Sequence, residues 1–436
     1  MKYYSTNKNA PLVGLRDAII RGLAPDRGLY MPERIKSLRA DFFEHIQDMS
    51  FQEIAYIVAQ AFFGEDVEAT ALRQIVYDTL SFDIPVVKII DNIYSLELFH
   101  GPTLAFKDVG ARFMARLLQY FIQQEKKEEI KVLVATSGDT GSAVANGFLG
   151  VNGIHVYVLY PAGKVSKIQE SQFTTLGKNI TAIEVSGVFD DCQALVKAAF
   201  MDEELNHRFN LTSANSINVA RFLPQTFYYF NAYAQMKRIR KADNLVVCVP
   251  SGNLGNITAG LFAQQMGLPV KNFIAANNDN DVFCQYLQTG YYTPQPSKQT
   301  IANAMDVGDP SNFARILALY NGSWETIVKH ITGATYTDNQ IREIIKKCYG
   351  QTRYILDPHG ACAYRALTEK LKPHEVGIFL ETAHPSKFKE KIDDILETNI
   401  EMPERLAAFI KNQKQSLPMN ADFQTFKSLL LNDICL

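Results

Sequence analysis

Residues 245–265 read LVVCVPSGNLGNITAGLFAQQ, and the order of residue types in this stretch indicates the architecture of the protein. Its first six residues are almost all apolar, which predicts a strand buried on both faces. A loop with two glycines, Gly252 and Gly255, comes next, and apolar residues at helical spacing resume over 257–265. A buried strand that leads through a glycine loop into a helix is typical of one strand–helix unit of a parallel α/β sheet.

The same alternation extends in both directions from this stretch. The runs KVLVAT at 131–136 and IHVYVLY at 154–160 predict two more buried strands, and helical spacing marks 108–124 and 142–149. Together they predict doubly wound, open α/β sheets, in which ligands bind beyond the carboxyl ends of the strands. Shorter β-rich runs lie at 93–99, 180–185, 272–276 and 377–380.

The first ninety residues have a different pattern. The run FQEIAYIVAQAFF at 51–63 has apolar residues at helical spacing, and a loop rich in glycine and proline covers 22–32. We therefore divide the chain into a mainly helical N-terminal segment, 1–92, and an α/β region, 93–436, that ends in a helical tail.

Composition excludes several classes of protein. The chain has 436 residues, of which 47% are hydrophobic, so it has material for a large core. Its 44 Lys and Arg against 46 Asp and Glu give a net charge of −2, which is no footprint for nucleic acid or an anionic membrane. The longest apolar runs fall well short of the roughly 20 residues that a membrane span needs.

The cysteines and the N-terminus predict a cytoplasmic protein. The N-terminus lacks the basic start, apolar stretch and small-residue cleavage site of a secretory signal. The six cysteines form no CxxC pair, which suits a reducing compartment and argues against a zinc site or a disulfide framework. We interpret all of them as small buried apolar residues: Cys192, Cys248, Cys284, Cys348, Cys362 and Cys435.

The loop PSGNLGNIT at 250–258 is the first candidate binding site. Its glycines let the backbone approach a ligand closely, and the N–H groups at the start of the following helix attract an anion. It matches neither GxxxxGK[ST] nor GxGxxG, so a single phosphate is a better ligand than a dinucleotide. The alternative is an ordinary glycine turn.

The loop TSGDTGS at 136–142 is the second candidate, and it again lies between a strand and a helix. Four hydroxyls and two glycines at one helix start predict a pocket for a carboxylate or a phosphate. The alternative is that Asp139 or Thr140 only caps the helix. Two such loops in one sheet suggest a ligand with two anionic ends, or a phosphorylated cofactor beside an anionic substrate.

A lysine stands in an unfavourable place in LELFHGPTLAFKDVG, residues 96–110. Lys107 comes where helical spacing resumes, so its charge would face the positive end of the helix dipole, behind apolar neighbours. Both effects favour the neutral amine, which is the nucleophilic form that condenses with an aldehyde. The alternative is that Lys107 reaches water or pairs with Asp108.

Five segments, HGPTLAFKD, SGDTG, SANSIN, SGNLGN and ETAHPSKF, occur in an order that resembles the threonine synthase family in its longer, non-allosteric class. The resemblance covers essentially the whole chain. It implies the tryptophan-synthase-β-like fold of pyridoxal-phosphate enzymes (fold type II), with two α/β subdomains and the cofactor, pyridoxal 5'-phosphate, between them. It also implies the conversion of O-phospho-L-homoserine and water into L-threonine and phosphate, by γ-elimination and β-replacement.

The resemblance also implies roles for residues. Lys107 would bind the cofactor covalently and carry the Cα proton, and Thr382 would face the pyridine nitrogen. The chain departs from the expected family pattern with Leu254 in place of Phe and Asn256 in place of Asp. The cofactor phosphate would lie on Gly252, Asn253, Leu254, Gly255 and Asn256. The amino-acid end of the substrate would lie on Ser137, Gly138, Asp139 and Thr140, and its phosphate near Arg112, Ser213, Asn215 and Arg221.

Several alternatives stay open at this point. A related pyridoxal-phosphate lyase, of the threonine dehydratase or cysteine synthase type, or a non-catalytic homologue that keeps the cofactor would share much of the pattern. Thr382 could merely cap a helix at 385–391. No His, Cys or Asp cluster has metal spacing, and the aromatic run at 227–230 predicts core or a subunit interface. We expect a small-molecule substrate, no nucleic acid or membrane partner, and a monomer or homodimer.

Overall fold

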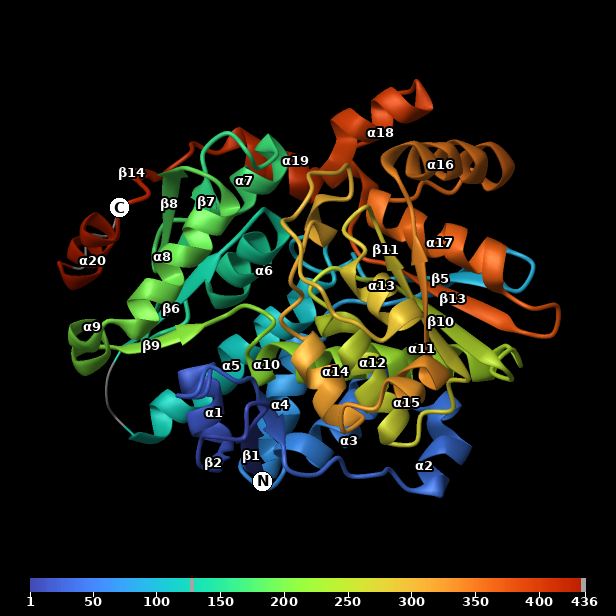
Figure 1. The fold of residues 1–436 in the computed structure, drawn as a ribbon, viewed down its shortest axis with the longest axis horizontal. Helices are drawn as coiled ribbons and strands as arrows, with labels where there is room; N and C mark the ends of the chain where they lie inside the picture. The colour runs from blue at the N-terminus through green and yellow to red at the C-terminus, as the bar shows by residue number, and fades with distance from the viewer. Residues whose placement is uncertain (126–128, 433–436) are drawn as a thin grey trace. The chain divides into compact units, whose positions relative to one another are not determined.

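The computed structural model describes residues 1–125 and 129–432. The chain divides into two compact units, which are described separately below. Each unit is an α/β structure built on one mainly parallel sheet (Figure 1), as the alternating pattern predicts. The first unit comprises Met1–Tyr30, Lys107–Arg221 and Met402–Leu436, and the second comprises Met31–Phe106 and Phe222–Glu401.

The sheet of the first unit has five strands in the order β14-β8-β7-β6-β9, all parallel. Strand order changes direction about β6, as in a doubly wound sheet. The strands are β6 (Ile130–Ala135), β7 (Ile154–Pro161), β8 (Ile180–Ser186), β9 (Asn210–Ser213) and β14 (Leu417–Asn420). The helices of this unit include α1 (Leu15–Arg21), α5 (Lys107–Glu125), α6 (Asp139–Phe148), α7 (Lys167–Thr174), α8 (Phe189–Met201), α9 (Glu203–Arg208), α19 (Glu404–Lys411) and α20 (Phe423–Leu431).

Both faces of this sheet are covered because its strands are apolar on both sides. Leu133, Tyr157 and Ile183 lie on one face and share a core with residues of α8 and α20. Val158 points to the other face, where α6 packs so closely that a Cβ added at Gly141 would lie 2.9 Å from the Val158 side chain. The continuous apolar strands therefore reflect burial on two sides.

The sheet of the second unit has six strands in the order β12-β11-β10-β13-β5-β4. All neighbours are parallel except β4 and β5, which form an antiparallel pair at one edge. The strands are β4 (Val86–Ile90), β5 (Ile93–Glu97), β10 (Leu245–Pro250), β11 (Asn272–Asn277), β12 (Ile331–Thr335) and β13 (Val376–Glu381). The helices include α3 (Phe51–Phe63), α11 (Thr226–Arg238), α12 (Gly255–Gln265), α16 (Asp338–Thr352), α17 (Pro358–Lys370) and α18 (Lys389–Leu396).

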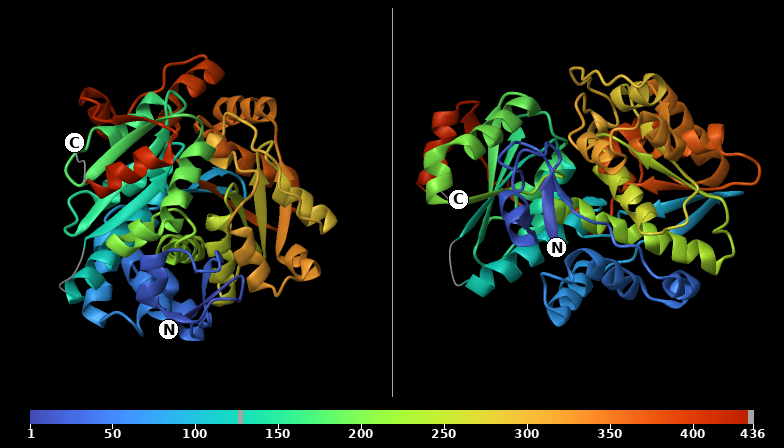
Figure 2. Two further views of the ribbon diagram at one scale, coloured as in Figure 1. Left: turned by 60° about the vertical axis from the view of Figure 1, so that its left-hand side comes forward. Right: turned by 60° about the horizontal axis from the view of Figure 1, so that its bottom comes forward.

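Helices also lie on both faces of the second sheet (Figure 2). Val246 and Ile274 share a core with residues of α16 and α17. On the other face, a Cβ added at Gly260 of α12 would lie 2.6 Å from the Phe273 ring and 2.9 Å from Tyr229 of α11. The run at 227–230 is buried, as the core interpretation predicts.

The expectation that the loops at 136–142 and 250–258 belong to one sheet is wrong, because they follow β6 and β10, which are strands of different sheets. The bounds of the predicted elements agree well with the structure, with two differences. Helix α3 has the predicted bounds and begins with a capping box, in which Glu53 N donates to Ser50 Oγ (3.3 Å) and Ser50 N to Glu53 Oε2 (2.8 Å). Helix α6 begins at Asp139, three residues before the predicted 142. The expected helix at 385–391 is instead a 3₁₀ turn, η4 (Pro385–Phe388), followed by α18.

The N-terminal part contains short strands as well as its helices, among them β1 (Lys2–Ser5), β2 (Val13–Gly14) and β3 (Tyr30–Pro32). The division of the chain at 92/93 stays a prediction. The cysteines at 192, 248, 284, 348 and 362 are free and buried, as predicted, and Cys435 lies outside the described residues. Within 1–125 and 129–432, no helix has the length and apolar character to cross a bilayer.

Candidate active site

The loop after β10 leads into the start of α12 in the second unit. Leu254 has a left-handed backbone (φ 60°), and this turn ends at Gly255, where α12 begins. The first main-chain bond of the helix runs from Thr258 N to Leu254 O (3.0 Å), so the N–H groups of Gly255 and Asn256 point beyond the helix end. Such groups bind phosphate.

A segment at 302–312 packs against this loop and fixes it. A Cβ added at Gly252 would lie 2.7 Å from Met305 Cα and 3.0 Å from Ala304 O, so only glycine fits there. The same segment holds Asn253, because Asn253 Oδ1 accepts from Ser311 N (2.6 Å) and its carbonyl accepts from Asn312 Nδ2 (2.9 Å). The segment thus holds the loop at two consecutive residues.

Asn256 shows why the expected Asp is dispensable at this position. Its Oδ1 accepts from the hydroxyls of Tyr228 and Tyr229, both at 2.7 Å, and burial raises the pKa of both tyrosines well above the usual value. An amide oxygen accepts these two bonds as a carboxylate would. Its Nδ2 is buried without an acceptor in the described part of the chain, so the loop offers donors and fits a phosphate group.

The residues just before Lys107 are joined to the turn after β13. Phe106 N donates to Thr382 O (2.9 Å), His384 N donates to Leu104 O (3.0 Å), and Ala105 pairs with Ala383 in an isolated bridge. Lys107 is the next residue and the first of α5, as predicted from its spacing. Thr382 does not cap the following turn, because the N-cap of η4 is His384, whose Nδ1 accepts from Ser386 N (3.2 Å).

In the first unit, the loop after β6 is closed by the hydroxyl of Thr136. This Oγ1 accepts from Gly138 N (2.9 Å) and Gly141 N (2.8 Å). Neither Asp139 nor Thr140 is the N-cap, so that alternative is wrong; the N-cap is Gly138. The Asp139 carboxylate accepts from Gln169 Nε2 (2.9 Å), and the N–H groups of Asp139 and Thr140 lie at the open end of the helix.

Two of the residues predicted to bind the substrate phosphate lie beside this loop. Asn215 Nδ2 donates to Ala135 O (3.2 Å), at the end of β6, and Asn215 N donates to Ser213 Oγ (3.2 Å). The structure therefore brings Ser213 and Asn215 to the loop at 136–141.

The two predicted arginines also belong to the first unit, and Arg221 contacts the residue between Ser213 and Asn215. Arg221 is almost fully buried, and its Nη1 donates to the carbonyl of Ala214. Burial lowers the pKa of Arg221 to about 10, and nearby Asp108 opposes that shift. Arg112 is on α5, and its carbonyl accepts from Arg116 Nη1 (3.1 Å). Arg221 thus interacts both with Asp108, at the start of α5, and with the carbonyl of Ala214.

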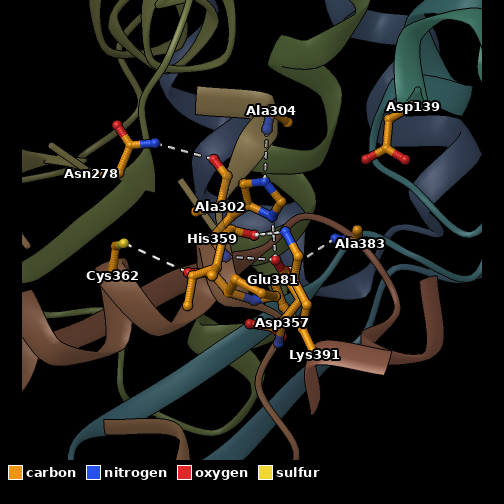
Figure 3. A network of polar contacts seen from close by, with 12 residues as sticks. Asp139, Asn278, Ala302, Ala304, Asp357, His359, Cys362, Glu381, Ala383 and Lys391 are labelled. Atoms are coloured by element: carbon orange, nitrogen blue, oxygen red, sulfur yellow. Dashed lines mark hydrogen bonds and ion pairs between the residues drawn. The ribbon is translucent and has the colours of Figure 1, made fainter. Parts of the chain in front are cut away.

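A buried cluster of acids and a histidine lies in the second unit, with Glu381 and Ala383 on either side of Thr382 in the chain among its members (Figure 3). His359 Nδ1 lies 2.5 Å from Asp357 Oδ1, and Glu381 accepts from Asp357 N. Burial, together with the nearby Asp357 carboxylate, raises the pKa of Glu381 well above its usual value. Burial thus disfavours a second carboxylate charge beside Asp357.

Sequence reasoning missed this cluster and also Gln169. Asp357 followed by Pro358 is a helix-start signal, and Asp357 indeed caps α17. The bonds from Ala304 N to His359 Nε2 and from Ala383 N to Asp357 Oδ2, however, depend on the tertiary fold and have no local signal. Among the described residues, no group of three His, Cys, Asp or Glu side chains could hold a metal ion.

Three family models match consecutive parts of the chain. The model for pyridoxal-phosphate dependent enzymes matches residues 88–380. The model for the threonine synthase N terminus matches 2–80, and that for the threonine synthase C-terminal region matches 359–430.

Individual relatives agree with the family models. Threonine synthase of Escherichia coli is 40% identical over 433 residues, covering 99% of this chain and 100% of that protein. Its crystal structure superposes with a TM-score of 0.93 over 100% of both chains. The crystal structure of pyridoxal-phosphate-bound threonine synthase from Brucella melitensis, 31% identical, gives a TM-score of 0.92 over 99% of both chains.

Proposed function

Because the chain belongs to the threonine synthase family of pyridoxal-phosphate dependent enzymes, we propose that it makes L-threonine and phosphate from O-phospho-L-homoserine and water. The observation that carries the proposal is the match to threonine-synthase models at both ends of the chain, which a general pyridoxal-phosphate lyase would lack. The resemblance given by the five sequence segments agrees with it.

The cofactor is pyridoxal 5'-phosphate, and the loop at 252–256 would hold its phosphate through main-chain N–H groups. Its ring supplies the electron sink that lets negative charge form at Cα and Cβ of the substrate. The donors of the loop, the close packing at Gly252 and the buried Nδ2 of Asn256 support this assignment.

Lys107 is our candidate for the covalent link to the cofactor and for the catalytic base. Its place at the first position of α5 makes the ammonium form unfavourable, because the positive end of the helix dipole lies there. A neutral Nζ accepts the Cα proton and returns it later, so one group performs both proton transfers. The bond between Phe106 N and Thr382 O fixes the backbone from which Lys107 emerges.

We assign the amino-acid end of the substrate to the loop at 137–140. The N–H groups of Asp139 and Thr140 lie at a helix start, where a carboxylate is favoured. Gln169 fixes Asp139, and Thr136 fixes Gly138 and Gly141, so these donors do not reorganise when substrate binds. Ser213 and Asn215 lie nearby and are our candidates for the substrate phosphate, with Arg112 and Arg221 as weaker ones.

Thr382 is our candidate for the residue that faces the pyridine nitrogen. A neutral hydroxyl can donate to an unprotonated ring nitrogen, whereas a carboxylate there would keep that nitrogen protonated. The electron sink is then milder, which suits elimination and replacement. The buried position of Thr382 and its carbonyl bond to Phe106 N support the assignment.

Two product assays test the function. Purified protein with pyridoxal phosphate is given O-phospho-L-homoserine, and both L-threonine and phosphate are measured; a second assay gives L-threonine and measures 2-oxobutanoate. We expect equal amounts of threonine and phosphate, both abolished in Lys107→Ala. Faster release of 2-oxobutanoate would replace our proposal with a dehydratase, and cofactor binding without either product would indicate a non-catalytic homologue.

We also propose a cytoplasmic enzyme, supported by five free, buried cysteines in the described chain. A monomer and a homodimer are both compatible with the sequence, and sedimentation equilibrium distinguishes them. The balanced charge supports the prediction that nucleic acid is no partner.

A further inference from the structure

The buried pair Asp357 and His359 is bonded to two separate parts of the candidate cofactor site in the second unit. On one side, Ala304 N donates to His359 Nε2 (3.2 Å), and on the other, Ala383 N donates to Asp357 Oδ2 (3.3 Å). Figure 3 shows both bonds converging on the pair. His359 is 2% exposed and Asp357 is fully buried, so water does not compete for these bonds.

The bonds of His359 define its protonation. A backbone N–H can only donate, so Nε2, which receives the bond from Ala304, carries no proton. The proton of the neutral ring is therefore on Nδ1, which faces Asp357 Oδ1 at 2.5 Å. A carboxylate–imidazole pair of this kind fixes both the tautomer and the orientation of the ring.

Ala304 matters because the phosphate loop lies directly on it. The Gly252 backbone approaches Ala304 O and Met305 Cα so closely that a methyl group would not fit between them. A shift of residues 304–305 would therefore move the glycine that begins the loop. On the other side, Ala383 follows Thr382, our candidate partner of the ring nitrogen.

We propose that Asp357 and His359 are positioning residues for the cofactor, which set the phosphate loop through Ala304 and the Thr382 turn through Ala383. The inference rests on the proposed cofactor site. Neither side chain touches the cofactor in this account, and each acts through a main-chain N–H group.

The same segment has a second anchor, so loss of the bond to His359 should leave it folded. The Asp306 carboxylate accepts from Thr300 Oγ1 (2.7 Å) and Asn278 Nδ2 (2.8 Å). These bonds hold the segment at residue 306, two residues beyond Ala304. A substitution of His359 should therefore loosen residues 304–305, on which Gly252 packs, without unfolding the unit.

The experiment measures binding of pyridoxal phosphate and of pyridoxal, which lacks the phosphate, to the apoprotein of matched variants. His359→Gln keeps an acceptor oxygen near the position of Nε2, whereas His359→Asn keeps a donor near Nδ1 but is too short to reach Ala304. We expect His359→Asn to lose about tenfold in affinity for pyridoxal phosphate and little for pyridoxal. His359→Gln should stay within about threefold of the wild type for both ligands.

Two more variants test the partners of the pair. Ala304→Pro removes the N–H at residue 304 and leaves His359 intact, so its affinity for pyridoxal phosphate should fall by the same factor as in His359→Asn. The double variant should have no lower affinity than either single variant, because both changes remove the same bond. Asp357→Asn places an amide nitrogen opposite Ala383 N, so it should weaken pyridoxal and pyridoxal phosphate alike. Thermal unfolding checks that each apoprotein is folded. If His359→Asn does not fold, the affinity of Ala304→Pro for pyridoxal phosphate tests the role of the bond between Ala304 N and His359.

Several results would overturn the inference. They are unchanged binding in both His359→Asn and Ala304→Pro, equal losses of both ligands in those variants, or a loss in His359→Gln as large as that in His359→Asn. Unchanged binding in Asp357→Asn would remove the role of that residue. Failure of the wild-type protein to bind pyridoxal phosphate would instead overturn the proposed function.

Discussion

Gly252 is the residue at which backbone packing most clearly limits the side chain. A Cβ there would lie 2.7 Å from Met305 Cα, and a main-chain atom cannot move aside as a flexible side chain can. We predict that Gly252→Ala weakens binding of pyridoxal phosphate by at least about tenfold. Fluorescence titration of the apoprotein measures this.

Gly350, in α16, provides the control for this substitution. No atom lies within 4 Å of a Cβ added there, so Gly350→Ala should leave the affinity unchanged and stabilise the protein by about 0.5–1 kcal/mol. If Gly252→Ala bound the cofactor as well as Gly350→Ala, the loop at 252–256 would not be the phosphate site.

A substitution at Gly138 tests substrate binding independently of cofactor binding. Its φ of 142° is open only to glycine, and a Cβ would lie 2.6 Å from Gln169 Cδ. Gly138→Ala should therefore lower kcat/KM for O-phospho-L-homoserine by about tenfold or more, because it displaces the donors at 139 and 140. Affinity for pyridoxal phosphate should not change.

Gly150 also has a positive φ, 72°, but open space around it. Gly150→Ala should cost about 1 kcal/mol of stability and leave kcat/KM unaltered. A common loss of cofactor affinity and kcat/KM in Gly138→Ala would contradict the assignment of this loop to the substrate.

At the scale of single residues, the sequence predicted best where backbone conformation determines the residue type. Gly252 and Gly255 mark a turn that is seen as predicted, and Lys107 begins a helix. Gln169 and His359 could not be assigned roles, because their partners at 139 and 304 are far away in the chain.

The turn η4 gives a prediction about pH at the scale of one element. His384 caps it as a neutral ring, since its Nδ1 accepts from Ser386 N. Burial lowers the pKa of His384 from 6.5 to about 4. The unfolded chain binds this proton more readily, so the contribution of His384 to stability is complete above pH 6.5 and is lost as pH falls toward 4.

We predict that this loss amounts to about 2 kcal/mol of unfolding free energy, after allowance for solvent screening. In His384→Asn the amide oxygen still caps the turn, and the group no longer titrates. Denaturant unfolding at several pH values compares the two proteins. If both lost stability equally between pH 6.5 and 4, the titration of His384 would not be the cause.

Elements were predicted reliably where apolar periodicity is long. Helix α3 was found with its bounds, and the strands that were predicted lie within one or two residues of their expected places. The short strands β9, β12 and β14 were not predicted. The start of α6 was missed because its first turn is supported by a threonine outside the helix, Thr136, whose Oγ1 accepts from Gly141 N. The helix at 385–391 was interrupted because His384 and Ser386 favour a tighter turn at its beginning.

The protein as a whole should be stabilised by its cofactor. A ligand that binds only the folded protein raises the free energy of unfolding by RT ln(1 + [L]/Kd). This increase is about 4 kcal/mol at a ligand concentration of 1,000 Kd. We predict that removal of pyridoxal phosphate lowers Tm and that its return restores Tm in the wild type. Calorimetry measures both, and Lys107→Ala should recover only part of the increase. An equal Tm with and without cofactor would contradict a site built into the fold.

The fold class followed from composition and alternation alone, whereas the chemistry required specific segments. No local pattern distinguishes a phosphate-binding glycine loop from an ordinary turn. The assignment of activity depended on the order of five segments along the chain, which the family models at both ends support.

The most direct test of the central claim is to find where the cofactor is attached. Freshly prepared holoprotein is reduced with borohydride, digested, and examined by mass spectrometry for a phosphopyridoxyl group. We expect the group on the peptide that contains Lys107 and on no other lysine. A holoprotein that retains its cofactor but carries the group elsewhere, or carries none, would contradict the account.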